Sequence, residues 1–349
     1  MKAKEFNPER LKLARQCRGL TIKELSSKAG ISTRSLSAFE NSQKEPSYET
    51  VKKLAYALNF PEDFFFKDDP PNIRLEAVSF QALSRLFASL RNRFISAAKM
   101  AIEINEWIET KLMLPEPDIP DLSNMDPETA AQVLRDQWGL GQKPISRVIP
   151  LVEAKGVRVF SIPERHYDID AFSFWRNERP FIFLNTNRSV ERIRFDVAHE
   201  LGHLVLHKHE QPRGKSPESE AHRFASAFLM PAGSIISIAD ESRFYTLDHF
   251  LKLKLIWGVS VAAIIRRFHD LGIITDWRYR TLNIELAKKG YFKNEPNPVS
   301  YHELSLLWPK ALKILKEMGI SKFKLAQALS FNPKDIESLF RNLMLTRIK

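Results

Sequence analysis

The feature that most constrains this chain is the stretch 195–207, which reads FDVAHELGHLVLH. Within it, His199 and His203 are four residues apart and therefore lie on one face of a helix. Two imidazoles on one face can bind a single metal ion, and Glu200 can reach a water molecule on that ion. This HExxH arrangement is typical of zinc sites in which the Glu acts as general base.

The residues around the motif favour a metal site over a purely structural helix. The flanks are apolar, which predicts burial: Ala198, Leu201, Leu204, Val205 and Leu206. Two histidines and a glutamate in a buried helix are costly unless they are paired. The alternative is a core helix whose histidines bond to backbone carbonyls, whereas a metal accounts for all three polar residues together.

A third metal ligand is expected downstream, and three residues qualify. His209 stands six residues after His203, but the Gly that would turn the chain there is replaced by Leu206, in an apolar run that predicts continued helix. Glu218 shares a helical face with small alanines, which would let two helices approach closely, and Glu220 points elsewhere. We favour Glu218 and keep Glu220 as the fallback; the alternative for either is a solvated Glu at a helix start.

The segments RFDVAHELGHLVLH and ESEAHRFASAFLMP together resemble the ImmA/IrrE metallo-endopeptidases. The usual family pattern is RF-x-x-AHELGH-LLLH, then E-x-x-A-N/D-x-FA-x-x-LLMP. The resemblance implies Zn²⁺ on His199, His203 and Glu218, with Glu200 as the catalytic acid and base. His222 departs from the family, which usually has Asn or Asp there, so it can support the metal ligands through a ring nitrogen or weaken the site.

An oxyanion stabiliser is also expected near the metal, and the sequence does not choose among its candidates. The candidates for supporting the metal ligands or the oxyanion are His222, Tyr245 and His207. The metal itself is open too, because Mn²⁺ or Fe²⁺ can use similar ligands.

Length and composition place the chain among cytoplasmic proteins of several domains. A chain of 349 residues with 44% hydrophobic residues predicts two or three domains with real cores. Cys17 is the single cysteine, which excludes a disulfide framework and a Cys-rich zinc site. The N-terminus has no apolar segment typical of a signal peptide, and no run approaches the roughly 18 apolar residues that span a membrane. The net charge of +11 is compatible with an anionic partner, nucleic acid first, and equally with a merely solvated basic surface.

The first 66 residues predict five short helices with helix-turn-helix spacing. Thr21 and Glu24 form a capping box, Gly30 ends that helix, and Ser32 caps the next. A helix, a short turn with Gly and a second helix are typical of this DNA-binding motif. The alternative is a helical module that binds protein.

The segment LTIKELSSKAGISTRSLSAFENSQKEPSYETVKKLAYAL resembles the XRE (Cro/repressor-like) helix-turn-helix family along its whole length. The helix 32–40 would read double-stranded DNA, with polar side chains on phosphates or base edges and Arg34 on guanine. The candidate DNA-binding residues are Ser32, Thr33, Arg34, Ser37, Gln43 and Lys44. Such domains usually bind two-fold sites as dimers, so a homodimer is a further candidate, although no dimer seam is evident.

The middle of the chain predicts a helical connection and then a small sheet. Residues 79–112 have apolar and aromatic residues at helical spacing, which favours packing on the peptidase or on a second copy. Short strands are expected at 157–160, 171–175 and 180–185, with the last two joined by a turn. An edge strand can align an extended peptide, so we expect 172–175 to lie near the substrate.

The last segment is basic and helical. Helices are expected over 301–318 and 322–329, after a basic loop at 287–296. Residues 320–329 faintly resemble the second helix of the N-terminal unit. A degenerate second helix-turn-helix over 320–344 is therefore an alternative to the small helical bundle that we favour.

Together these features predict a mainly α protein with a small β-sheet, of the α+β class. We assign 1–69 to the DNA-binding domain, 70–125 to a helical linker, 126–280 to the metallopeptidase domain and 281–349 to the basic helical region. The intact HExxH favours a DNA-tethered zinc endopeptidase that cuts a repressor or another regulatory protein. The alternatives are a non-proteolytic regulator whose zinc domain senses a signal, and an antitoxin that binds a toxin.

Overall fold

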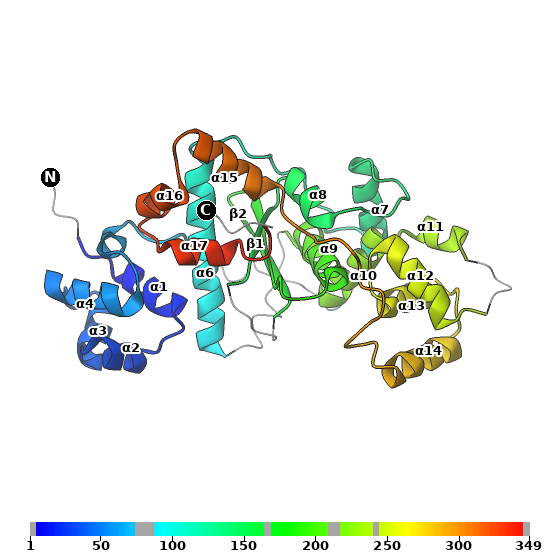
Figure 1. Cartoon of the computed structure of the whole chain (residues 1–349), viewed down its shortest axis with the longest axis horizontal. Coiled ribbons are helices and arrows are strands. Elements are labelled where there is room, and N and C mark those ends of the chain that lie inside the picture. The colour runs from blue at the N-terminus through cyan, green and yellow to red at the C-terminus, as the bar shows by residue number, and fades with distance from the viewer. Residues whose placement is uncertain (1–4, 74–86, 164–168, 209–216, 240–243, 345–349) are drawn as a thin grey trace.

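The computed structural model (Figure 1) describes residues 5–73, 87–163, 169–208, 217–239 and 244–344. It confirms the predicted class, because helices dominate and one three-stranded sheet lies in the middle of the molecule. Among the described residues, no helix is both long and apolar enough to cross a membrane.

The sheet has the strand order β1-β3-β2. Its strands are β1 (Arg158–Ser161), β2 (Ala171–Arg176) and β3 (Arg179–Leu184). β1 runs parallel to β3, and β2 runs antiparallel to it through a two-residue turn. Asn177 and Glu178 in that turn both have positive φ, of 45° and 57°, which matches the twist of a tight hairpin. β2 is therefore an edge strand, as the sequence predicted for the neighbourhood of a substrate.

The alternation of side chains along the strands divides the protein into two cores. One face of the sheet carries five buried aromatic rings, of Phe160, Phe172, Phe174, Phe181 and Phe183. The opposite face carries aliphatic side chains that belong to the other core: Val159, Ala171, Ile182 and Leu184. Because each face is buried, the sheet connects the two halves of the molecule rather than bounding one of them.

On the aliphatic side, the helix with the HExxH motif packs directly on the sheet, and further helices complete this core. These helices are α7 (Pro127–Gln137), α8 (Val148–Ala154), α9 (Val190–Leu206), α10 (Pro217–Leu229), α11 (Ala232–Ser237), α12 (Leu247–Trp257), α13 (Val261–Asp270) and α14 (Asp276–Lys288). Helices α11, α12 and α14 were not predicted from the sequence. Local signals were present for two of them, because Gly258 ends α12 in the left-handed conformation and the Thr275 side chain caps α14.

The aromatic face is covered by α6 (Ala88–Glu109), the long helix at the centre of Figure 1. Phe94 of α6 lies 6.5 Å from Phe172 between ring centroids, and Arg158 of β1 donates to Asn105 and Glu109 of the same helix. The segment assigned to a linker thus packs on the sheet, one of the two placements that its aromatic residues predicted. The predicted part at 79–86 lies outside the described residues.

The N-terminal unit has the predicted helix-turn-helix geometry. Its elements are α1 (Pro8–Cys17), α2 (Ile22–Ala29), α3 (Thr33–Glu40), α4 (Tyr48–Leu58) and the 3₁₀ turn η1 (Glu62–Phe66). Thr21 and Glu24 form the expected capping box, Gly30 is left-handed at φ 65°, and Ser32 accepts from the backbone N–H of Ser35. Arg15 holds Glu40 with two hydrogen bonds of 2.6 and 2.7 Å, which ties α1 to the end of α3.

The C-terminal helices lie against α6 beside the N-terminal unit (Figure 1) and are α15 (Leu307–Glu317), α16 (Lys322–Leu329) and α17 (Pro333–Leu339). The helix expected from residue 301 begins six residues later, because the preceding segment serves as an anchor. Within it, Glu303 is buried, accepts from the backbone N–H groups of Val148 and Ile149, and pairs with Arg194 of α9 at 2.6 Å.

A helix-turn-helix unit repeats at the C-terminus with an offset of 300 residues. α2 and α16 both have eight residues, and each begins at a Thr or Ser cap, Thr21 or Ser321. Each ends at a left-handed residue, Gly30 or Ser330. The turn bonds repeat as well, since Ile31 N donates to Ser26 O and Phe331 N donates to Ala326 O. The structure therefore favours the second helix-turn-helix over the small bundle.

Glu153 fastens this C-terminal unit to α8. Its carboxylate accepts from the backbone N–H groups of Leu306 and Leu307, at 2.9 and 3.0 Å, where α15 begins. Burial raises the pKa of Glu153 to about 7, although hydrogen bonds from Ser305 and these N–H groups oppose the shift. The carboxyl group is thus protonated in the fold at a pH where an unfolded chain has already ionised it.

This shift makes stability depend on pH through Glu153. A folded pKa above the ordinary value contributes stability that is complete below pH 4.5 and is lost as the pH rises through 7. The shift is worth about 3 kcal/mol. We expect Glu153→Gln to remove this part of the fall in unfolding free energy between pH 4.5 and 8, as measured by urea denaturation. Glu317→Gln, at an exposed position on α15, is the control, and equal pH profiles for Glu153→Gln and the wild type would contradict the assignment.

Candidate metal centre

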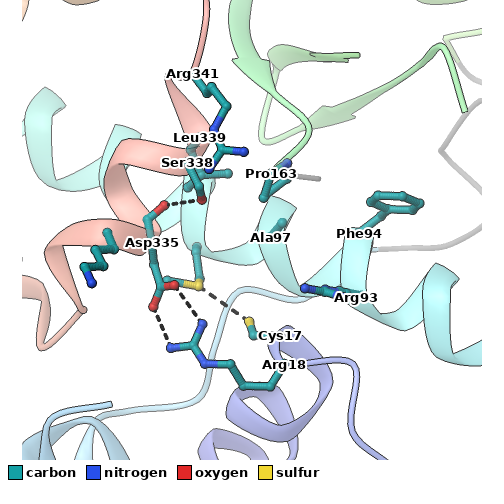
Figure 2. A pocket seen from close by; sticks show the side chains of 12 residues that line it. Cys17, Arg18, Arg93, Phe94, Ala97, Pro163, Asp335, Ser338, Leu339 and Arg341 are labelled. Atoms are coloured by element: carbon teal, nitrogen blue, oxygen red, sulfur yellow. Dashed lines mark hydrogen bonds and ion pairs between the residues drawn. The ribbon is translucent and has the colours of Figure 1, made fainter. Parts of the chain in front are cut away.

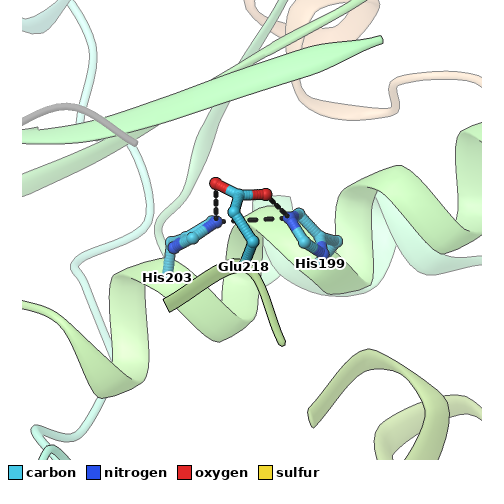
Figure 3. Close-up of side chains that lie close together, drawn as sticks. All are labelled: His199, His203 and Glu218. Atoms are coloured by element: carbon cyan, nitrogen blue, oxygen red, sulfur yellow. Dashed lines mark hydrogen bonds and ion pairs between the residues drawn. The ribbon is translucent and has the colours of Figure 1, made fainter. Parts of the chain in front are cut away.

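Three side chains from two helices converge at one point (Figure 3). His199 Nε2 and His203 Nε2 of α9 are 3.2 Å apart. Glu218 of α10 places one carboxylate oxygen 3.3 Å from His199 Nε2 and the other 3.5 Å from His203 Nε2. One donor atom from each of the three residues lies within 4.8 Å of the others, so the group can hold a metal ion.

The close approach of α9 and α10 is what brings Glu218 to the two histidines. A Cβ atom on Gly202 would lie 3.0 Å from the ring of Phe224 and 3.2 Å from the Cα of Ala221. Ala221 and Ala225 are fully buried on the facing side of α10. The small residues on this face therefore act as the sequence predicted, because they let the two helix backbones come together.

The electrostatics of the cluster match a site for a cation. Hydrogen bonds from His199 and His203 hold the pKa of Glu218 well below its ordinary value. Burial lowers the pKa of His199, but the hydrogen bond to Glu218 and the charge of Glu200 outweigh it and raise the pKa overall. The carboxylates thus attract positive charge to the point where the imidazole nitrogens meet.

Glu200 lies on the same helix, and its carboxylate is held from the sheet. Its side chain is 4% exposed, and Ser173 Oγ of β2 donates to Glu200 Oε2 at 2.6 Å. No separate role was predicted for Ser173 from the sequence. The signal was present, because a small polar residue between Phe172 and Phe174 faces the opposite side of the strand from both rings.

The side chains of 172–175, which we expected near a substrate, point alternately to the two faces of the sheet. Phe172 and Phe174 point into the aromatic core and away from Glu200. Ser173 faces α9, and Trp175 Nε1 donates to the carbonyl of Leu204 on the same helix. Two residues of the strand therefore adjoin the site.

Glu220, the fallback ligand, contacts a different residue. His207 Nε2 lies 3.0 Å from Glu220 Oε2, and His207 Nδ1 lies 3.1 Å from His203 Nδ1. The structure places Glu218 in the cluster and Glu220 behind it, so that a chain runs from Glu220 through His207 to His203. Outer partners of this kind fix the orientation of a metal-binding imidazole.

The remaining candidates for supporting the metal ligands or an oxyanion lie at different distances from the cluster. The ring of His222 is 6.1 Å from that of His199 and packs edge-on against Phe195. Tyr245 is buried in the aliphatic core, with its ring 5.3 Å from that of Phe268. The geometry therefore keeps His222 and His207 near the site and offers no support for Tyr245. His209 lies outside the described residues.

The candidate DNA-binding residues gather at the start of α3 and in the loop after it. Ser32, Thr33, Arg34, Gln43 and Lys44 are exposed. Two hydroxyls also have local partners, since Ser32 caps α3 and the half-buried Ser37 accepts from Asn41 Nδ2. Thr33 and Arg34 are thus the candidates that project from the first turn of α3.

Two family models match the chain, in the regions that the geometry singles out. Residues 152–269 match a peptidase model described as the IrrE N-terminal-like domain, and residues 9–68 match a model described as a helix-turn-helix domain. No curated protein matches the chain significantly. The chain therefore carries an N-terminal helix-turn-helix domain of the XRE type, followed by an IrrE-like domain of a metallopeptidase family.

Single substitutions distinguish the roles of the two glutamates of α10 in metal binding. We expect Glu218→Ala to weaken Zn²⁺ binding by about 100-fold or more, because it removes a ligand atom from the cluster. Glu220→Ala is expected to cost about tenfold or less, as an outer partner does. Competition with a zinc-binding dye measures both constants, and a larger loss for Glu220→Ala would assign the ligand to that residue.

Proposed function

We propose that this DNA-binding regulator uses its IrrE-like domain as a zinc-dependent endopeptidase. The convergence of His199, His203 and Glu218, with Glu200 buried next to the first histidine, is the observation that carries this proposal. A peptidase family model over the same residues supports it.

The donor set of the cluster fits zinc. Two imidazole nitrogens and one carboxylate are the ligands of many catalytic zinc sites, which keep a fourth position for water or substrate. Zinc bound by these residues would polarise a peptide carbonyl and lower the pKa of a water molecule toward neutral.

In this proposal Glu200 moves the proton. Its carboxylate accepts a proton from the attacking water and then donates it to the nitrogen of the leaving amine. Ser173 holds this carboxylate through its 2.6 Å hydrogen bond, which fixes the group between α9 and β2. Ser173 is a positioning residue in this account.

A large cavity beside the cluster supports a polypeptide substrate. Its volume is about 1,080 Å³, and it is lined by Phe195 of α9 and by Ser219 and His222 of α10. On the other side it is lined by residues of α13 and α14, and it reaches Asp170, the residue before β2. A peptide bound here would lie between α13 and His222, next to the cluster of His199, His203 and Glu218.

In this proposal the helix-turn-helix domain localises the peptidase on DNA. We infer that it binds double-stranded DNA in the cytoplasm through Thr33 and Arg34, with Gln43 and Lys44 on phosphates, as a homodimer on a two-fold site. A repressor or another regulatory protein bound nearby is then the substrate, because the shared DNA raises its effective concentration. A non-proteolytic regulator and an antitoxin remain the competing functions, and both predict that Glu200 is dispensable.

The first test of this function is Glu200→Gln in cells that carry the gene. We expect the variant to keep its zinc and to lose cleavage by at least 100-fold, because general-base catalysis contributes about 10²–10⁴. Profiling of new protein N-termini, in the wild type against the variant, identifies the substrate. Identical N-termini in both strains would favour one of the non-proteolytic functions.

The second test separates DNA binding from cleavage. Replacing Thr33 and Arg34 together by Ala should weaken operator binding at least tenfold, since a side chain that pairs well with a base edge is worth about 1–3 kcal/mol. Cleavage of the DNA-bound substrate should slow with it, while cleavage without DNA stays unchanged. Fluorescence anisotropy measures the first effect and gel analysis the second. Equally fast cleavage on DNA by the double variant would refute the tether.

A further inference from the structure

A cavity of about 230 Å³ lies where three parts of the chain meet (Figure 2). Cys17 and Arg18 come from the end of α1 in the DNA-binding domain. Arg93, Phe94 and other residues come from α6. The C-terminal unit supplies the remaining side, from α17 and the residues that follow it. The cavity lies outside the residue range that matches the peptidase model, apart from one proline.

The repeat of the helix-turn-helix unit explains which face of α17 lines this cavity. With the offset of 300 residues, the lining residues Lys334, Ser338 and Arg341 correspond to Arg34, Ala38 and Asn41. In the N-terminal unit Arg34 and Asn41 are exposed on the helix that is expected to read DNA. In the C-terminal unit the same face is directed toward α6 and α1. A face that we expect to contact DNA in one copy therefore lines a small cavity in the other.

The charges around this cavity are strongly unbalanced. Among the described lining residues, Arg18, Arg93, Lys334 and Arg341 stand beside a single carboxylate, Asp335. Burial lowers the pKa of Arg93, and the charge on Arg18 lowers it further. Cys17 adds no negative charge, because burial raises the pKa of its thiol to about 12. The excess of positive charge in a partly enclosed space favours a bound anion.

Asp335 already shows how an anion is held here. Its two carboxylate oxygens accept from Arg18 Nη1 and Nη2 at 2.7 and 2.8 Å (Figure 2). This paired arrangement is the one by which guanidinium groups bind carboxylates and phosphates. Arg93 and Arg341 come from different elements around the same space, so they can share the oxygens of a second anion.

We propose that this cavity binds a small phosphate-bearing molecule. A tetrahedral phosphate offers oxygens in several directions, which suits guanidinium groups that approach from α1, α6 and the end of α17. The volume is below the roughly 300–1,000 Å³ of sites for drug-sized ligands, so the ligand is inorganic phosphate or a small phosphate ester.

The position of the site gives the ligand a consequence for the DNA-binding domain. Arg18 also donates to the backbone carbonyls of Leu58 and Asn59, at the end of α4. The Arg18–Asp335 pair thus joins the DNA-binding domain to the C-terminal unit. A phosphate that competes with Asp335 for Arg18 would change this contact, and the site is therefore placed to report a metabolite to the DNA-binding domain.

Calorimetric titration of the full chain with inorganic phosphate, at constant ionic strength, tests the proposal. We expect one saturable site per chain. Arg341→Gln should weaken it at least tenfold, as expected for a charge-assisted hydrogen bond worth about 1.5–3 kcal/mol. Arg341 is exposed, and its guanidinium group makes no ion pair with the other residues drawn in Figure 2, so the substitution should leave the fold intact. Arg280→Gln, at an exposed position on α14, is the matched control and should leave binding unchanged.

Asp335→Asn gives an effect of the opposite sign. It removes a carboxylate that repels the ligand, so the affinity should rise roughly threefold or more. A second titration with glycerol 3-phosphate distinguishes the sources, since tighter binding of the ester assigns the site to a metabolite and tighter binding of phosphate assigns it to the free ion. The proposal is overturned if no saturable binding occurs with either probe, or if Arg341→Gln and Arg280→Gln behave alike.

Discussion

The packing of α9 against α10 is the constraint on which the rest of the site depends. Gly202 has no room for a Cβ atom against Ala221 and Phe224, and this close packing sets the distance between the two helices. Because His203 lies next to Gly202 and Glu218 lies one turn before Ala221, the same packing brings the ligand atoms together. The cluster of His199, His203 and Glu218 is thus a consequence of backbone packing, and these polar side chains are tolerated beside the core because they pair with one another.

The sheet connects the helices of this site to the rest of the protein. Its aliphatic face packs on α9, and Ser173 on that face donates a hydrogen bond to Glu200. Its aromatic face packs on α6 and the C-terminal unit, and α1 of the DNA-binding domain packs on α6 in turn. The DNA-binding domain and the peptidase-family domain are therefore connected through α6 and the sheet. Glu303 and Glu153 complete the connection by binding the C-terminal unit to α8 and α9.

The sequence was informative where a residue type has one structural meaning. The HExxH spacing, the capping box at Thr21 and the turn at Gly30 predicted helices whose positions the structure confirms. The small residues of α10 predicted the close approach of the two helices. Ser173 was missed although its alternation with Phe172 and Phe174 carried a signal. The buried Glu303 could not be found in this way, because its partners Val148 and Arg194 lie 155 and 109 residues away along the chain. The start of α15 moved for the same reason, since a long-range anchor outweighed local helix propensity.

Anomalous diffraction at the zinc absorption edge, from crystals grown with Zn²⁺, tests the central claim most directly. The account predicts one strong peak for each chain, in contact with His199, His203 and Glu218, with Glu200 close by but not a ligand. A peak bound elsewhere would contradict it. So would a peak whose third ligand is Glu220 or His222 while Glu218 turns away.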